Sequence, residues 1–231
     1  MKRILVAVMT ALLLSGGIQV NAQLTKEQIK ERKEIYKASK DELNRKASKA
    51  ARKEAKKLSK AGWQCAPGAL PLEKQLDRSY MMQMEFDGEM FPKYIMAEAM
   101  SIGENYDAAK LQAIELAKQN LAGQIQTEVT ALIENSVTNR QLSAEQAATI
   151  SETVVASKSR IIQSLGRVIP VVEVYRSVPS NRNKEVLVRL AYNSDMAKST
   201  VKAILYEKLE NKADNLHNQL DSIFDANAKI K

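Results

Sequence analysis

Two long stretches of this 231-residue chain, residues 26–60 and 193–227, contain neither glycine nor proline. Glycine and proline are the residues that most often end a helix, and the whole chain holds only eight glycines and five prolines. Aromatic residues make up 5% of the chain. A barrel or sandwich of many short strands needs more turn residues than this, so we expect long helices joined by few turns.

The first 22 residues have the three parts of a secretory signal peptide. A basic start precedes an apolar stretch over residues 4–14, and two small residues, Val20 and Ala22, stand three and one positions before Gln23. At about 1.5 Å per residue, that stretch is too short to cross a hydrocarbon core of about 30 Å. No cysteine for lipid attachment follows the expected cleavage point. We therefore expect residues 1–22 to be removed and the mature protein to be periplasmic or secreted, without an integral membrane span and at most peripheral to the outer membrane.

Positive charge is concentrated just after this segment. Residues 23–62 hold 14 basic and 6 acidic side chains and are rich in good helix formers, which predicts a basic helical arm. The second half of the arm places like charges four residues apart, at a cost of roughly a few tenths of a kcal/mol per pair, and a bound anion would relieve this repulsion. The candidate anion-contact residues are Lys49, Arg52, Lys53 and Lys56.

Two other interpretations of the arm stay open. The like charges can belong to a solvated helix surface that tolerates the repulsion, or the arm can pack on a protein partner through a thin apolar stripe that includes Ile29, Tyr36 and Leu43. The arm lacks aromatic residues placed for base stacking, so nucleic acid is not an expected partner.

The rest of the chain predicts an α+β body over residues 79–212, joined to the arm by a linker over 63–78 and followed by a helical extension and tail over 213–231. Apolar alternation predicts strands, and recurrence at threes and fours predicts helices. The expected strands are 80–86, 93–102, 168–178 and 185–192, and the expected helices are 105–137, 143–165 and 193–227. We expect the body to fold without the arm.

The expected strands come as hairpins rather than as strand–helix–strand crossovers, which favours the α+β class. We predict a small, mainly antiparallel four-stranded sheet packed by the two middle helices. A long basic N-terminal helix and a long C-terminal helix complete the expected architecture.

The sequence carries no catalytic signature. One cysteine excludes a disulfide framework and cysteine-based zinc motifs, and one histidine excludes a histidine-rich metal site. There is no nucleophile elbow, no phosphate-cradling glycine loop and no metal-ligand spacing. We interpret Cys65 and His217 as incidental side chains, and we expect no catalytic residue, no metal site, no cofactor and no enzymatic activity.

Residues 94 to about 209 resemble a known domain group. The likeness lies in an extended segment over 94–99, an alanine-spaced helix that includes Ala108, Ala113 and Ala117, and then strands over 171–175 and 186–190. This order resembles the domain shared by a small bacterial outer-membrane lipoprotein of the Lpp-twenty type and the N-terminal part of flagellar assembly protein T, and the whole chain resembles exported proteins of Bacteroidetes. The resemblance implies an α+β envelope domain used in assembly or surface display, with no catalytic residues to carry over. The lipidated cysteine of the lipoprotein members has no counterpart here.

Together these observations predict a non-enzymatic exported cell-envelope protein with a structural, assembly or interaction role. Its expected partner is another envelope protein or a second copy of itself. The alternative is an anion-binding module that contacts lipopolysaccharide or another acidic polymer through its basic N-terminal helix. An enzyme is the third and least favoured class.

Overall fold

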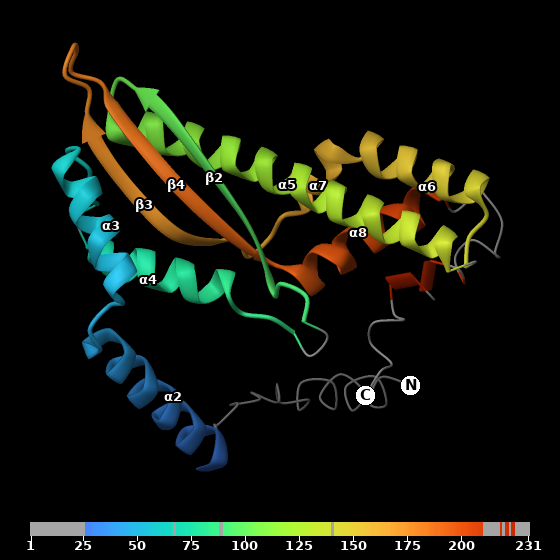
Figure 1. Cartoon of the computed structure of the whole chain (residues 1–231), viewed down its shortest axis with the longest axis horizontal. Helices are drawn as coiled ribbons and strands as arrows, with labels where there is room; N and C mark the ends of the chain where they lie inside the picture. The colour runs from blue at the N-terminus through green and yellow to red at the C-terminus, as the bar shows by residue number, and fades with distance from the viewer. Residues whose placement is uncertain are drawn as a thin grey trace, which may run out of the picture. The chain divides into compact units, whose positions relative to one another are not determined.

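The computed structural model in Figure 1 describes residues 26–66, 68–87, 90–139 and 141–209, and also positions 218, 220, 221, 223 and 224. The expected signal peptide and most of the expected C-terminal extension, His217 included, lie outside the described residues. The chain divides into two compact units between Lys46 and Ala47. Helix α2, Lys26–Asn44, belongs to the first unit, and every other described element belongs to the second.

The second unit is built on a four-stranded antiparallel sheet with the order β1-β3-β4-β2, which confirms the α+β class. Its central pair is the hairpin formed by β3 (Ile169–Ser177) and β4 (Lys184–Asn193), close to where the sequence predicts it. The outer strands are β1 (Gln64–Cys65) on one side and β2 (Tyr94–Gly103) on the other. β2 keeps one unbroken register with β4 along its whole length, from Tyr94 opposite Asn193 to Gly103 opposite Lys184.

One face of the sheet is covered by the long helix α5, Tyr106–Thr138. Small residues make this close packing possible, because Ala109, Ala113 and Ala117 are fully buried against β4. The approach is closest where β2 turns into α5, since a Cβ atom on Gly103 would lie 2.6 Å from the backbone nitrogen of Ala109. Only glycine fits there without a shift of the backbone.

Beyond the sheet, α5 continues into a helical layer with α6 (Ala144–Ala156), α7 (Lys158–Ser164) and α8 (Ser194–Leu209). α6 and α7 pack mainly on α5 and α8, so α5 is the middle helix that covers the sheet. The capping box that opens α6 is present as the sequence predicts, with Ser143 and Gln146 bonded to each other's backbone amides. The expected helix over 143–165 is divided at Ser157.

The expected C-terminal helix begins at Ser194, as predicted, and is continuous to Leu209. Of the residues that follow, five are described, and all five are helical. Leu220 and Ile223 are buried in the same core as α5 and α8.

The opposite face of the sheet is covered by α3 (Lys49–Lys60) and α4 (Leu72–Gln83), as Figure 1 shows. This second core is rich in small side chains from α3. Its members are Ala47, Ala51, Ala55, Trp63, Leu72, Leu76, Val172 and Val174. The second half of the basic arm is therefore part of the body, and the boundary of the body lies at Ala47 instead of residue 79.

Two expectations for residues 63–86 are wrong. The expected linker over 63–78 contains strand β1 and most of α4, and the expected strand over 80–86 begins with the last turn of α4. The alternation of large side chains that predicted a strand does not correspond to alternate burial. Met82 is buried with Leu76 and Ser79 at helical spacing, whereas Met84 and Phe86, beyond the end of α4, are exposed. The fourth strand of the sheet is β1 instead.

The expected single helix of the arm is also divided, with α2 ending at Asn44 and α3 beginning at Lys49. Ser48 caps α3, because its hydroxyl accepts a hydrogen bond from the Ala51 amide at 3.2 Å. The Ser48 amide in turn donates to a carboxylate oxygen of Asp77 on α4 at 2.9 Å. The start of α3 is thus fixed to the neighbouring helix of the body.

Candidate anion-binding site

Helix α3 carries six basic side chains in 12 residues, and all six lie on the side away from the core. We call this set the α3 basic face. It comprises Lys49, Arg52, Lys53, Lys56, Lys57 and Lys60. At 3.6 residues per turn they span an arc of about 140°. The opposite side of the helix holds Ala51 and Ala55, which are 0% and 8% exposed.

The structure brings the four predicted anion-contact residues onto this one face. Lys49, Lys53 and Lys56 are exposed, whereas Arg52 is half-buried and its Nε donates to the carbonyl oxygen of Ala47 at 3.1 Å. Arg52 therefore has part of its hydrogen-bonding capacity taken up by the backbone that precedes α3. The three lysines project freely from the helix and carry most of the accessible charge of the predicted set.

An open hollow of about 700 Å³ lies beside α3. Four lysines line it, two of which the sequence singled out, Lys53 and Lys56, and two of which it missed, Lys57 and Lys60. Lys49 and Arg52 do not line the hollow. Lys57 and Lys60 lie four residues after Lys53 and Lys56, so helical spacing places them on the same face. This spacing was the sequence signal that could have identified them.

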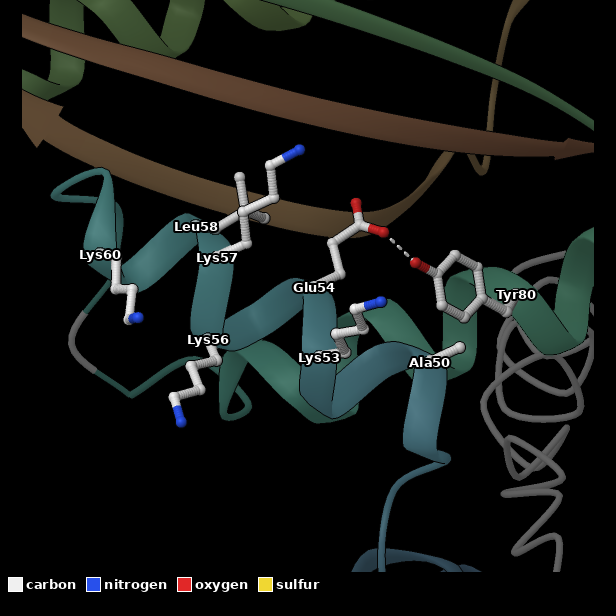
Figure 2. A pocket seen from close by; sticks show the side chains of 8 residues that line it. All are labelled: Ala50, Lys53, Glu54, Lys56, Lys57, Leu58, Lys60 and Tyr80. Carbon is white, nitrogen blue, oxygen red and sulfur yellow. Dashed lines mark hydrogen bonds between the residues drawn. The ribbon is translucent and has the colours of Figure 1, made fainter.

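Figure 2 shows how the lining residues of the hollow are arranged. All of them come from α3 except Tyr80, which comes from α4. Ala50 and Leu58 supply apolar wall between the charged side chains, and Glu54 points toward the Tyr80 ring. The hollow therefore joins cationic groups and a limited apolar surface.

Glu54 is the one acidic residue of α3, and it is engaged by α4. The Tyr80 hydroxyl donates a hydrogen bond to its carboxylate. This hydrogen bond, together with partial burial and the negative charge of Glu54, raises the pKa of Tyr80 to about 12. Tyr80 thus stays protonated at neutral pH and holds Glu54 at the contact between the two helices.

The α3 basic face has no internal counter-charge. Among the residues that the structure describes, no carboxylate forms an ion pair with any of its six basic side chains. Several cations elsewhere in the body are neutralised, as in the pairs of Arg189 with Glu98 at 2.7 Å and Lys110 with Glu173 at 2.8 Å. A concentrated, unneutralised positive face attracts an external anion.

The remaining candidate chemistry is limited. Partial burial raises the pKa of the Cys65 thiol, which favours the protonated thiol over the reactive thiolate, and Gln75 donates to its sulfur at 3.4 Å. Within the described part of the chain, no three histidine, cysteine, aspartate or glutamate residues lie together as a metal site would require. None of the described helices has both the length and the apolar character needed to cross a bilayer.

Comparison with protein-family models, with curated proteins and with solved structures finds no match to this chain. The resemblance to the lipoprotein and flagellar assembly domain therefore stays a prediction from the sequence. The site has to be interpreted from its own geometry and charge.

Proposed function

We propose that this protein is a non-enzymatic, exported cell-envelope protein that binds an anionic surface through the α3 basic face. Phosphate groups of lipopolysaccharide or of another acidic polymer are the expected ligands. The observation that supports this function is the set of six basic side chains, unpaired within the described chain, on the open face of a helix whose other face is buried.

The way in which α3 is held favours binding. Two of its alanines, Ala51 and Ala55, are buried against the body, its first turn is capped by Ser48, and Glu54 is bonded to Tyr80 on α4. The helix backbone is therefore ordered before any ligand arrives. Binding then costs only the ordering of lysine side chains, which is less than the cost of ordering a whole segment.

The dimensions of the basic face favour an extended ligand. Lys49 and Lys60 are the first and last residues of the helix, and at 1.5 Å per residue they lie about 16 Å apart along its axis. A single small anion would contact only part of this length, whereas a polymer or a membrane surface presents several phosphates at once. Each basic residue near an anionic surface contributes roughly 1 kcal/mol at moderate salt.

Export and an envelope location are supported by the sequence alone. The pattern of residues 1–22 is that of a cleaved signal peptide, and no cysteine stands at the expected cleavage point. A peripheral protein of this kind needs a non-covalent means of retention at its surface, and the α3 basic face supplies one. N-terminal sequencing of the exported protein should return Gln23.

The proposed binding is tested by two variants that remove the same amount of charge. The first replaces Lys53, Lys56, Lys57 and Lys60 of α3 with glutamine, and the second does the same to four lysines of α2. The α2 set is Lys30, Lys33, Lys37 and Lys40. Both variants and the wild type are sedimented with neutral vesicles, with vesicles that contain anionic lipid, and with lipopolysaccharide, at low and at high salt.

We expect the wild type to sediment with the anionic samples, and to be released at high salt because exposed charges are screened within about 8 Å at physiological salt. The α3 variant should bind at least about tenfold more weakly, since four contacts of roughly 1 kcal/mol each are removed. The α2 variant should keep most of its binding. Equal losses in the two variants would indicate a response to net charge only, and sedimentation that is indifferent to salt would reject an electrostatic contact.

A further inference from the structure

The two edges of the sheet are very different. At one edge, β1 is only two residues long and lies beside α3 and α4. At the other edge, β2 is ten residues long, and among the strands that the structure describes it pairs with β4 alone (Figure 1). A long free edge is an open template for another strand unless the protein blocks it.

Two hydrogen bonds show which backbone groups of β2 face outward. The Ser194 amide donates to the Lys93 carbonyl at 3.0 Å, which extends the ladder between β2 and β4. The Glu98 carbonyl instead accepts from the Asn120 side chain of α5 at 3.0 Å. The backbone groups of odd-numbered β2 residues therefore bond to β4. Because hydrogen-bonded and non-hydrogen-bonded pairs alternate in an antiparallel ladder, the amides and carbonyls of even-numbered residues point to the free edge. The outward row is Tyr94, Met96, Glu98, Met100 and Ile102.

β2 lacks most of the features that usually prevent edge pairing, although the Asn120 side chain already bonds to the outward Glu98 carbonyl. It contains no proline, lysine or arginine, and its register with β4 is free of bulges. Its single charge, Glu98, is neutralised by Arg189 of β4, with which it forms a 2.7 Å ion pair. Met100 and Ile102 are 49% and 51% exposed. The strand thus offers a regular, uncharged and partly apolar edge.

Helix α5 follows the same edge with a row of residues four apart. Gln112 accepts a hydrogen bond from the Ser101 hydroxyl at 2.6 Å, Asn120 contacts Glu98, and Gln124 lines a hollow of about 290 Å³ together with Met96. Leu116 lies between Gln112 and Asn120 in this row and is 37% exposed. The row therefore places an apolar side chain beside the outward backbone groups of β2.

We propose that β2 is a self-association edge, at which a second copy of this chain adds its own β2 in antiparallel orientation. A copy presents the same row of donors and acceptors, so a two-fold arrangement satisfies both edges at once. No unneutralised charge on β2 calls for a partner of opposite sign. The pairing is centred on Met100, because a register centred on Glu98 would place two carboxylates opposite each other. This inference is independent of the α3 basic face.

Amide hydrogen exchange of the full-length protein, measured by NMR at low and at high protein concentration, tests the pairing directly. The amides of Ala99 and Ser101 bond to β4 and should exchange slowly at both concentrations. The amides of Met100 and Ile102 should exchange rapidly when the protein is dilute and at least about tenfold more slowly when it is concentrated. Sedimentation velocity should show the mass of one chain when the protein is dilute and twice that mass when it is concentrated.

Two substitutions on one helix provide a matched pair. Leu116→Lys places a charge beside the proposed edge and should weaken dimerisation at least about tenfold. Leu111→Lys makes the same change at a more exposed position of α5, away from that row, and should leave dimerisation unchanged. Met100→Pro removes an outward amide without removing a bond to β4 and should abolish the dimer. Far-UV circular dichroism checks that each variant is folded.

A chain that stays monomeric at every concentration would overturn the proposal, whether or not a strand of another protein binds at β2. So would a dimer in which the amides of Met100 and Ile102 still exchange rapidly, because its interface would lie elsewhere. Equal effects of Leu116→Lys and Leu111→Lys would also overturn it.

Discussion

Helices α2 and α3 are both rich in lysine and have very different surroundings. Both fall within the stretch that the sequence predicts as one helix, but α3 has three alanines in 12 residues and α2 has one in 19. Every side chain of α2 that the structure describes is exposed, including Tyr36 at 71% and Leu43 at 56%. α3 buries Ala51 completely and Ala55 almost completely.

This difference shows that small residues can matter more than large apolar ones in deciding which helix joins a core. Ala51 and Ala55 of α3 are buried in one cluster with Leu76, Val172 and Trp63, because their small side chains let the helix backbone come close to its neighbours. The large apolar residues of α2, such as Ile29, Tyr36 and Leu43, recur only every seventh position on a narrow stripe. Fit to the neighbouring surface decides burial, because close packing depends on shape as well as hydrophobicity.

The charges of α2 and α3 also differ. α2 mixes acidic and basic residues, with Lys30 and Glu34 at 4.0 Å, and such exposed pairs contribute little to stability. α3 concentrates charge of one sign on its open face. An anionic partner therefore has more to gain from α3 than from α2, although both helices are rich in lysine.

The largest expected effect is that of deletion. Removing residues 26–46 should leave a cooperative thermal unfolding transition, whereas removing residues 26–61 should abolish it. The longer deletion takes α3 from the second core and exposes Leu76, Val172 and Val174, each worth about 1.5–3 kcal/mol when buried. That loss is comparable with the total stability of about 5–15 kcal/mol of a typical domain. Scanning calorimetry of the two deletions makes the measurement, and identical melting would show that α3 is dispensable for the body.

A smaller effect is expected when the same substitution is made in each helix. Ala51→Leu forces extra volume into a site that is 0% exposed and should destabilise the body by about 1–3 kcal/mol. Ala38→Leu in α2 is at an exposed site and should change stability by no more than about 0.5 kcal/mol. Urea denaturation midpoints compare the two. A similar shift for both would remove the distinction drawn between the helices.

The smallest expected effect concerns the bond between α3 and α4. Tyr80→Phe removes the hydrogen bond to Glu54 and should cost about 1 kcal/mol at neutral pH. The folded pKa of Tyr80, about 12, lies above the ordinary value of 10, so the folded state favours the protonated hydroxyl. Its contribution is therefore complete below pH 10 and is lost as the pH rises toward 12.

The difference in unfolding free energy between the wild type and Tyr80→Phe should accordingly shrink across this pH interval. Denaturant titrations at pH 8, 10 and 11.5 measure it, and taking the difference removes the titration that lysines contribute to both proteins. Tyr36→Phe in α2, where the ring is exposed, provides the control and should show no such trend. A difference that stays constant from pH 8 to 11.5 would contradict the assignment.

The parts of the fold that the sequence predicts correctly are those with long, locally complete patterns. The helix over 105–137 matches α5 within a residue or two, and the hairpin of 168–178 and 185–192 matches β3 and β4. The capping box at Ser143 could be found because all of its partners lie within four residues of sequence. Such signals need no knowledge of the tertiary structure.

The region over 63–86 could not be predicted in the same way. The strand β1 has only two residues, and its pairing partners Val174 and Tyr175 lie about a hundred positions further along the chain. The pattern Tyr80-Met81-Met82 is short enough to fit either a strand or a helix. Which of the two forms depends on the surface of β3 that α4 covers, and no local pattern contains that information.

The sequence by itself determined the charge of α3, its helical form and the grouping of its lysines on one arc, because these follow from residue type and a spacing of 3.6 residues per turn. Only the tertiary structure decided that the opposite face is buried, that Glu54 is turned toward Tyr80, and that Lys57 and Lys60 share a hollow with Lys53 and Lys56. The same holds for the outer edge of β2, since its partner strand β4 lies about 90 positions further along the chain. Burial and pairing are properties of surfaces that meet across long sequence separations, and they become defined only when the whole body is packed.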